Sequence, residues 1–376
     1  MRTGEQRARV SIVLGEIRNG GVERCLLNLA RGFVEREVAT DLIVRHPPTD
    51  LGGEIAPGVN LVEFNERTGH LESLAESVSK TGPPVAMLAA KENDAQLMFA
   101  LRERLGAPAI LIASLDYTGQ LDGRGAGPFR RWARYRSLRR HYRRADRIFC
   151  VSRGVADDMA RILRPDTPCL TVVPNPVVTP ELRQLADAPL NDPWFLNDEP
   201  PVVLGVGRLS LIKNFPLLVR AFARVHGELD ARLVILGEGK QRASLFELGK
   251  QLGLDDVMAL PGHVTNPYPY MKRAGLFVLS SLWEGFGNVL VEALACGTPV
   301  VATDCRSGPA EILQDGRYGS LVPAGDETAL ADAMIRTLRT PPSREFLEHA
   351  AVPYSLARSV DAYLGALGIG KPRTAA

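Results

Sequence analysis

The chain has 376 residues, of which 45% are hydrophobic, and its 45 basic and 43 acidic residues leave a net charge of +2. This length favours two domains, and the composition is that of an ordinary soluble α/β protein. No apolar run approaches the ~18 residues that span a bilayer, and the N-terminus lacks the apolar core of a signal peptide. The five cysteines form no C-x-x-C pair, so we expect buried free thiols in a cytoplasmic protein.

The chain begins with the pattern of a doubly wound domain. Arg9–Leu14 is a predicted strand, Gly20 and Gly21 form a loop, and a helix follows from about Val22 to Val34. Apolar residues on one face of that helix, including Leu26 and Leu29, predict that it packs on a sheet. Strand, glycine turn and helix open the doubly wound α/β fold. Paired glycines are equally typical of a simple tight turn.

Further strands and helices alternate up to about residue 174. The predicted strands are Thr40–Arg45, Asn60–Phe64, Pro84–Ala90, Ala109–Leu115, Arg147–Ser152 and Cys169–Pro174, and the helices include Leu71–Ser79, Asp94–Leu105 and Gly154–Leu163. This alternation predicts a parallel sheet covered by helices on both faces. Ligands of such sheets bind beyond the carboxyl ends of the strands. Six polar residues follow predicted strands and are therefore expected near a cleft: Lys91, Glu92, Asp94, Asp116, Ser152 and Asn175. Each of these residue types is also common in loops and helix caps.

A basic segment runs from Arg124 to Arg147. It contains ten arginines and one acidic residue, Asp146, with Trp132, Tyr135, Leu138 and Tyr142 interleaved at near-helical spacing. One interpretation is a solvated amphipathic helix. The other is a basic surface, edged by aromatic rings, for anionic lipid headgroups or a charged acceptor. Nucleic acid is a poorer candidate because no recognition motif accompanies the arginines.

A second α/β series follows a segment rich in Pro, Asp and Asn, Pro176–Pro201, which we interpret as an interdomain linker. Its strands are predicted at Val202–Arg208, Arg232–Leu236, Val257–Pro261 and Leu276–Ser280, and a helix capped by Asn214 continues to Glu228. Arg208 and Lys213 lie at a strand end beside a helix start, where a diphosphate would be neutralised. Solvated loop residues are the alternative explanation for both.

The most informative stretch is SLWEGFGNVLVEALACGTPVVAT, Ser281 to Thr303. A polar, glycine-rich loop precedes a predicted helix, Asn288–Cys296, with Asn288 as its N-cap and Gly297 after its end. The helix is apolar nearly all round, so it should be buried, yet Glu292 lies in its middle and Glu284 in the preceding loop. A helix start behind a glycine loop suits an anionic group. Two flanking carboxylates therefore suggest a ligand that is both phosphate and polyol: a nucleotide sugar.

Together with the GFG loop, the apolar helix and the G-T-P-V-V strand, the spacing of Glu284 and Glu292 resembles the retaining GT-B glycosyltransferases of family 4, also called glycosyl transferases group 1. The resemblance covers nearly the whole chain and is strongest from Val202 to Pro323. It implies two Rossmann-like domains facing a cleft, with the final helix, near Tyr354–Leu367, crossing back to the first domain. We expect an acceptor domain at 1–185, joined by 353–376, and a donor domain at 186–352.

The resemblance also implies roles for individual residues. Glu284, Arg208 and Lys213 would be catalytic, with Glu284 contacting the donor sugar and the two basic residues holding the diphosphate. Glu292 would bind the ribose, and the backbone at His263 and Val264 would hold the base. Donor binding would further involve Gly20, Gly21, Gly207, Gly285, Phe286, Gly287, Asn288 and Val289. Many family members carry a His after the strand that corresponds to Ala109–Leu115; here Asp116 is the candidate to replace it or to bind acceptor, with Ser152 and Asn175 also on the acceptor side.

The expected activity is transfer of a sugar from a nucleotide-diphosphate sugar to a hydroxyl acceptor with retention of configuration, in polysaccharide or glycolipid synthesis. A UDP-sugar is favoured over a GDP-sugar, and the acceptor would be a lipid-linked sugar or glycan. No Asp-x-Asp motif and no His/Cys cluster is present, so we expect neither metal nor other cofactor. The expected location is cytoplasmic, at the inner face of the membrane if Arg124–Arg147 binds anionic lipid. Two alternatives are a GT-B nucleotide-sugar epimerase and a catalytically silent protein that binds sugar nucleotides or a lipid surface.

Overall fold

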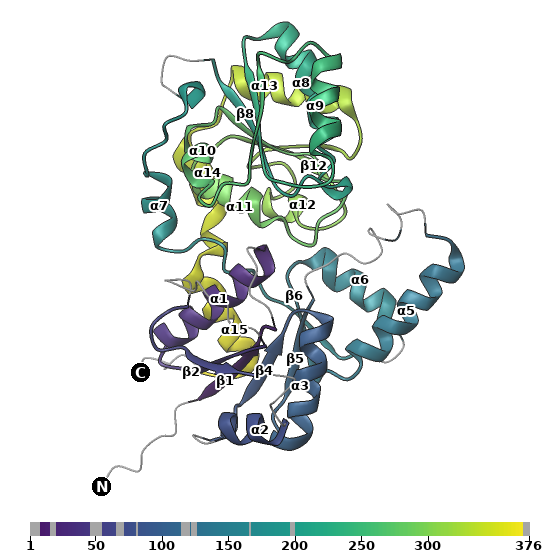
Figure 1. The fold of residues 1–376 in the computed structure, drawn as a ribbon, viewed down its shortest axis with the longest axis vertical. Helices are drawn as coiled ribbons and strands as arrows, with labels where there is room; N and C mark the ends of the chain where they lie inside the picture. The colour runs from purple at the N-terminus through teal and green to yellow at the C-terminus, as the bar shows by residue number, and fades with distance from the viewer. Residues whose placement is uncertain are drawn as a thin grey trace. The chain divides into compact units, whose positions relative to one another are not determined.

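The structure is a computed structural model that describes residues 8–15, 20–45, 55–64, 71–79, 82–113, 121, 126–164, 167–195 and 200–370. It divides into two compact units (Figure 1). Unit 1 consists of Met1–Ser114, Ala126–Val177 and Leu356–Ala376, and unit 2 contains Val178–Ser355. Each unit has its own parallel sheet, as the alternating strand and helix pattern predicts.

Unit 1 is built on a seven-stranded parallel sheet of order β3-β2-β1-β4-β5-β6-β7. Val10 of β1 pairs with Thr40 of β2 on one side and Ala86 of β4 on the other. The strands are β1 (Arg9–Val13), β2 (Ala39–Val44), β3 (Asn60–Glu63), β4 (Ala86–Ala89), β5 (Ala109–Ala113), β6 (Arg147–Cys150) and β7 (Cys169–Val172). Their helices are α1 (Gly21–Glu35), α2 (Leu71–Ser79), α3 (Glu92–Leu105), α5 (Pro128–Tyr142) and α6 (Arg153–Leu163).

The last helix, α15 (Leu356–Leu367), belongs to unit 1, which confirms the predicted return of the chain to the first domain. It packs on α1 at Gly32, where an added Cβ would lie 2.2 Å from Cγ2 of Val360. The ring of Tyr363 meets that of Phe149 edge to face, and Ser359 Oγ donates to the Asn175 carbonyl over 3.1 Å. The small side chain in α1 therefore sets how closely the two helices approach.

Unit 2 is built on a six-stranded parallel sheet of order β10-β9-β8-β11-β12-β13. The strands are β8 (Val202–Val206), β9 (Arg232–Leu236), β10 (Met258–Gly262), β11 (Leu276–Leu279), β12 (Val300–Asp304) and β13 (Ser320–Pro323). Around them lie α8 (Phe215–Glu228), α9 (Arg242–Gln251), α10 (Tyr268–Arg273), α11 (Asn288–Ala295), α12 (Pro309–Ile312), α13 (Glu327–Arg339) and α14 (Arg344–Ala351), with single 3₁₀ turns at Leu211–Lys213 and Val352–Tyr354.

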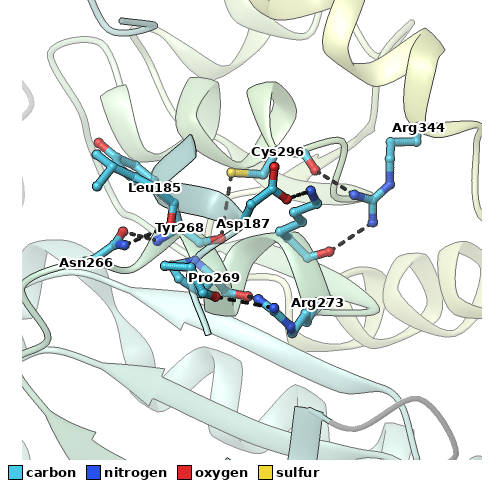
Figure 2. A network of polar contacts seen from close by, with 10 residues as sticks. Leu185, Asp187, Asn266, Tyr268, Pro269, Arg273, Cys296 and Arg344 are labelled. Carbon is cyan, nitrogen blue, oxygen red and sulfur yellow. Dashed lines mark hydrogen bonds and ion pairs between the residues drawn. The ribbon is translucent and has the colours of Figure 1, made fainter. Parts of the chain in front are cut away.

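The predicted linker contains more structure than its composition suggested. It holds α7 (Glu181–Ala186) and a 3₁₀ turn, Pro193–Phe195. Residues on and after α7 bind α10 and its flanks. Asn266 Nδ2 donates to the Leu185 carbonyl over 2.8 Å (Figure 2), and Lys272 of α10 pairs with Asp187. Arg273 donates to the Ala188 carbonyl. Residues 178–185, which we expected in the first domain, thus lie in unit 2, because their polar partners are there.

Two helix caps differ from the sequence prediction. Gly287, not Asn288, is the N-cap of α11, with a left-handed φ of 102° that glycine adopts without strain, and Asn288 is the first helical residue. Asn214 does precede α8, but it is itself left-handed with φ 47° and its side chain makes no cap hydrogen bond. Asparagine is among the residues that tolerate this conformation.

Candidate active site

The loops that follow β8 and β11 meet at the carboxyl edge of the unit 2 sheet. These two strands are neighbours, and the strand order reverses between them, since β9 and β10 lie on one side and β12 and β13 on the other. Such a switch point is where open α/β sheets bind ligands, because adjacent connections leave the sheet in opposite directions. The loop after β8 carries Arg208 and Lys213, and the loop after β11 carries Glu284.

Lys213 and Glu284 form an ion pair at this point, with Nζ 2.6 Å from Oε1. The same carboxylate oxygen accepts a hydrogen bond from Ser281 Oγ, also over 2.6 Å. The side chains of Lys213 and Glu284 are only 20% and 12% exposed. Two candidate catalytic residues, 71 positions apart in the sequence, are therefore in direct contact, and partial burial makes the contact stronger than a surface ion pair.

Backbone and hydroxyl hydrogen bonds fasten the two loops around this pair. Ser280 Oγ donates to the Lys213 carbonyl over 2.8 Å, and the Leu282 amide donates to the Ile212 carbonyl. Thr303 at the end of β12 donates to the Ser281 carbonyl over 2.6 Å. Since these partners come from three strands, the ion pair is positioned by the sheet itself rather than by one loop.

Glycines let neighbouring loops approach one another around the site. Gly237, after β9, has φ 144°, and a Cβ there would lie 1.9 Å from the carbonyl oxygen of Gly207. Gly308, after β12, has φ 95°, and a Cβ there would lie 1.8 Å from the carbonyl oxygen of Phe286. Any side chain at either position would force the backbones apart. The turns after β8 and β9 are thus packed against each other, and so are the turns after β11 and β12.

Helix α11 leaves this edge of the sheet with its start beside Glu284. Glu292 lies in its middle and is buried, with 8% of its surface exposed, as the apolar helix pattern predicted. Burial, with the Glu292 charge adding to it, raises the pKa of the Cys296 thiol to about 12. The same cause, burial, raises the pKa of Cys305 to about 12. Both thiols are therefore protonated and unsuited to act as nucleophiles.

The other predicted donor-binding residues lie on loops and on the first turn of α11, and they differ in exposure. Arg208 and His263 are exposed, Val264, Gly207 and Gly285 are half-buried, and Phe286 packs its ring edge to face against Tyr354. Asn288 and Val289 form the first turn of α11 and are half-buried. Ser281 was not among the predicted site residues, although a hydroxyl three residues before Glu284 could have indicated a hydrogen bond to its carboxylate.

The predicted residues of unit 1 have mixed outcomes. Gly20 is the N-cap of α1 and Gly21 its first residue. Ser152 is fully buried and caps α6 by accepting the Val155 amide over 3.2 Å, while Asn175 binds α15 through its carbonyl. Both have structural roles. Asp116 lies outside the described residues. Sequence reasoning missed Glu23, a buried residue of α1 that pairs with Lys91.

Among the described residues, no group of three or more His, Cys, Asp or Glu side chains is arranged to hold a metal ion. Across the same residues, no helix combines the length and the apolar character required to cross a membrane. All five cysteines are free thiols; Cys169 is exposed, and the other four are buried as predicted.

Two family models together match most of the chain. The model "Glycosyl transferases group 1" matches residues 190–352, which contain the Lys213–Glu284 site. The model "Glycosyl transferase 4-like domain" matches residues 20–176, in unit 1. The two matches follow the division of the structure into two units.

Curated relatives and solved structures agree with these models. An N-acetylgalactosaminyltransferase of Campylobacter jejuni acting on N-acetylgalactosamine-N,N'-diacetylbacillosaminyl-diphospho-undecaprenol is 37% identical over 191 residues, 50% of each chain. The chain thus matches about half the length of that relative. The lipopolysaccharide core biosynthesis glycosyltransferase LpsE of Rhizobium meliloti is 28% identical over 92% of this chain and 95% of its own.

The crystal structure of Anabaena HepE in complex with UDP and glucose superposes with a TM-score of 0.74, covering 96% of this chain and 100% of that one, at 17% identity. This likeness shows the fold: two α/β units, each with a parallel sheet, as in GT-B glycosyltransferases. Taken with the two family models, it confirms the resemblance drawn from the Glu284 to Glu292 stretch. The chain belongs to the glycosyl transferases group 1, the GT-B glycosyltransferases of family 4.

Proposed function

We propose that the protein transfers a sugar from a nucleotide-diphosphate sugar, preferably a UDP-sugar, to a hydroxyl acceptor in polysaccharide or glycolipid synthesis, with retention of configuration. The observation that carries this proposal is the Lys213–Glu284 ion pair at the switch point of unit 2. The C. jejuni relative and LpsE both act in glycan or glycolipid assembly by name. Anabaena HepE was crystallised with UDP and glucose.

The ion pair suits bond cleavage at a diphosphate leaving group. Negative charge grows on the diphosphate as its bond to the sugar breaks, and a fixed cation stabilises that charge more in the transition state than in the ground state. Lys213 is half-buried and held by its own carbonyl contact with Ser280. Glu284 and Ser281 keep its ammonium group in place, so little reorganisation is needed when charge develops.

The remaining residues have roles that follow from their positions. Glu284 would orient hydroxyl groups of the donor sugar next to Lys213, and Arg208 would add a second positive charge at the diphosphate. The backbone amides at the start of α11 would contribute further positive character. Glu292 would accept hydrogen bonds from the ribose. This set supplies the leaving-group charge without a divalent cation, so we propose a metal-independent reaction.

A donor screen tests the proposal directly. UDP-, GDP- and ADP-sugars are added separately, and thermal stabilisation and nucleotide release are measured for each. A ligand at about a hundredfold its dissociation constant adds roughly 2.7 kcal/mol to stability, which gives a clear shift in melting temperature. Transfer of the sugar to an acceptor hydroxyl, or slowly to water, releases free nucleotide; an epimerase would change the sugar without releasing it, and a silent protein would be stabilised without turnover. Either of these outcomes would replace the transferase proposal.

We further propose that α5 docks on an anionic membrane, which would give the protein access to a lipid-linked acceptor. The structure separates the arginines of this helix into two groups. Arg134 binds Glu92, and Arg139 binds the Ile162 carbonyl. Arg130, Arg136 and Arg140 are exposed.

The exposed face of α5 also carries two aromatic rings. Phe129 and Trp132 are 79% and 55% exposed, and their ring centroids lie 6.0 Å apart. The Arg136 guanidinium lies 5.7 Å from the Trp132 ring centroid. Leu138 and Tyr142, in contrast, are buried. Aromatic rings beside basic side chains on one helix face are the composition of interfacial membrane helices.

A further inference from the structure

The carboxyl edge of the unit 1 sheet holds a second cluster of charged side chains. Its strand order reverses between β1 and β4, and the residues after these strands, with the end of β2 and the first turns of α1 and α3, meet there. The cluster consists of Glu23, Arg45, Lys91 and Asp94. Lys91 Nζ lies 2.7 Å from Glu23 Oε1, and Arg45 Nη2 donates to the Asn93 carbonyl over 2.9 Å.

Asp94 is the unusual member. It is buried, with 4% of its surface exposed, and the Gly15 amide donates to its carboxyl group. Gly15 is needed there, since a Cβ would lie 2.5 Å from Asp94 Oδ1. The other oxygen, Oδ2, is buried and receives no hydrogen bond from any described residue. A buried polar atom without a partner is costly and calls for a specific explanation.

Burial raises the pKa of Asp94, and Lys91, Arg45 and the Gly15 amide oppose this change while Glu23 adds to it. A carboxyl group kept in such surroundings is not there for stability alone, because an amide or hydroxyl side chain would accept the Gly15 hydrogen bond without the cost of burying a charge. The position of Asp94 at a switch point favours a ligand as its missing partner.

The charge of the cluster indicates the chemical class of that ligand. Two carboxylates, Glu23 and Asp94, face two cations, Lys91 and Arg45. A phosphate group is bound where cations are in excess, and the described residues of this cluster carry no such excess. A neutral polyhydroxyl compound needs hydrogen-bond acceptors and donors side by side, and the cluster offers both.

We infer that Asp94, with Lys91 and Arg45, binds hydroxyl groups of a neutral sugar or polyol unit. If the chain is the glycosyltransferase proposed above, this unit is the terminal part of the acceptor, and Asp94 Oδ2 accepts a hydrogen bond from one of its hydroxyls. The identification as acceptor rests on the proposed function; the binding of a neutral polyol does not.

Saturation-transfer NMR on the full chain tests the inference, with methyl α-glucopyranoside and myo-inositol as neutral probes and inorganic phosphate as the anionic probe. We expect saturation transfer to the neutral probes, and a reduction of about fivefold or more in Asp94→Asn, consistent with loss of one good hydrogen bond. Asn keeps an oxygen for the Gly15 amide but presents an NH₂ group in place of Oδ2. Equal signals for Asp94→Asn and wild type, or no transfer from wild type, would overturn the inference.

Matched variants separate binding from folding and from the donor site. Asp41→Asn alters another buried carboxylate of the same sheet, one paired with Arg9 at 2.7 Å, and should lower stability without reducing the probe signal. Glu284→Gln should remove only the signal from probe bound at the proposed donor site, so the part of the signal that depends on Asp94 should remain. Phosphate binding that depends on Asp94, without polyol binding, would contradict the assigned class.

The outcomes distinguish this inference from the proposed function. If the protein turns over a nucleotide sugar and the probe signals are the same in Asp94→Asn and wild type, the polyol site is rejected and the transferase proposal stands. Probe binding that depends on Asp94, in a protein that releases nucleotide from none of the donors, would keep the polyol site and reject the transferase. In turnover with a polyol acceptor, Asp94→Asn should raise KM for the acceptor while leaving KM for the donor unchanged.

Discussion

The two sheets carry charged clusters at equivalent places, and the clusters differ in how completely they are paired. At the switch point of unit 2, Glu284 Oε1 lies 2.6 Å from both Lys213 Nζ and Ser281 Oγ and is hydrogen-bonded to both. At that of unit 1, Lys91 and Glu23 are paired but Asp94 keeps one buried oxygen without a partner among the described residues. A preorganised ion pair suits a site that stabilises charge as a bond breaks, whereas an unmatched acceptor suits a site that binds a neutral hydroxyl.

Removing Lys213 should break the unit 2 cluster with the largest effect of any single change. Lys213→Ala should lower the rate of transfer by on the order of 10²–10³, or roughly 2.7–4 kcal/mol, the cost of losing one preorganised donor to a developing charge. Lys272→Ala is the control, because Lys272, on α10, pairs with Asp187 at the end of α7 and has no role in the proposed site. If the steady-state transfer rate falls equally in both variants, Lys213 has no specific role in the transfer reaction.

Glu292 tests whether the donor site of unit 2 extends along α11. Glu292→Ala should weaken binding of the donor nucleotide by tenfold or more, because a charge-assisted hydrogen bond contributes about 1.5–3 kcal/mol. Titration calorimetry with UDP measures this. Glu228→Ala, which removes an exposed carboxylate paired with Arg339, should have no effect. Unchanged UDP affinity in the Glu292 variant would limit the donor site to the loops after β8 and β11.

The exposed arginines of α5 test whether unit 1 is the part that meets lipid. Arg136→Ala and Arg140→Ala should each weaken binding to vesicles containing phosphatidylglycerol by about 1 kcal/mol, or roughly fivefold. Added salt should weaken the wild-type binding. Arg161→Ala, on the neighbouring helix α6, is the matched control. Sedimentation with pure phosphatidylcholine vesicles equal to that with anionic ones would return α5 to a solvated surface helix.

A smaller effect concerns the stability of unit 1. The folded-state pKa of Asp94 is raised above its ordinary value of 3.8, so its contribution to stability is present below that pH and is lost as pH rises through the folded-state pKa. Asp94→Asn does not titrate. The melting temperature of Asp94→Asn relative to wild type should therefore rise as the pH increases above about 4. A relative melting temperature that falls over this range would mean that the carboxylate is better stabilised than its burial implies.

The smallest expected effect is that of chelation. If Lys213, Arg208 and the start of α11 supply the leaving-group charge, excess EDTA should leave the transfer rate unchanged. Inductively coupled plasma analysis of the same sample checks that metal has been removed. Loss of activity that Mg²⁺ or Mn²⁺ restores would show that a cation, held by residues other than those proposed, completes the diphosphate site.

The sequence was sufficient for the fold class and for most strands. Runs such as VVLGV and RLVIL are short, apolar and bounded by turn residues, so they predict buried strands. The strand predicted at Val202–Arg208 forms at Val202–Val206, and the strand predicted at Arg232–Leu236 forms there. The helix predicted at Asn288–Cys296 forms at Asn288–Ala295 because its composition and its following glycine are local signals. The caps were less predictable: Gly287 rather than Asn288 precedes α11, since a left-handed turn was needed there.

Long-range contacts required the tertiary structure. Glu284 and Lys213 were each identified from local patterns, but nothing in those patterns states that their side chains touch across 71 residues. Pro176–Pro201 was predicted to be a plain linker, yet Leu185 and Asp187 within it bind Asn266 and Lys272, which lie beside and on α10. The cap that Ser152 forms on α6 also became evident only in the structure.

The sequence by itself determined most strands, the parallel character of the sheets and the family, because apolar periodicity, turn residues and a contiguous motif all act over short stretches of chain. Only the tertiary structure decided which charges are satisfied and which are not. Glu23, Arg45, Lys91 and Asp94 come from four different loops and helices, and burial and pairing arise when the sheet brings those loops to one edge. The electrostatic state of a group depends on these distant neighbours. The local sequence around Asp94 therefore could not predict that Oδ2 is buried without a hydrogen-bond partner among the described residues.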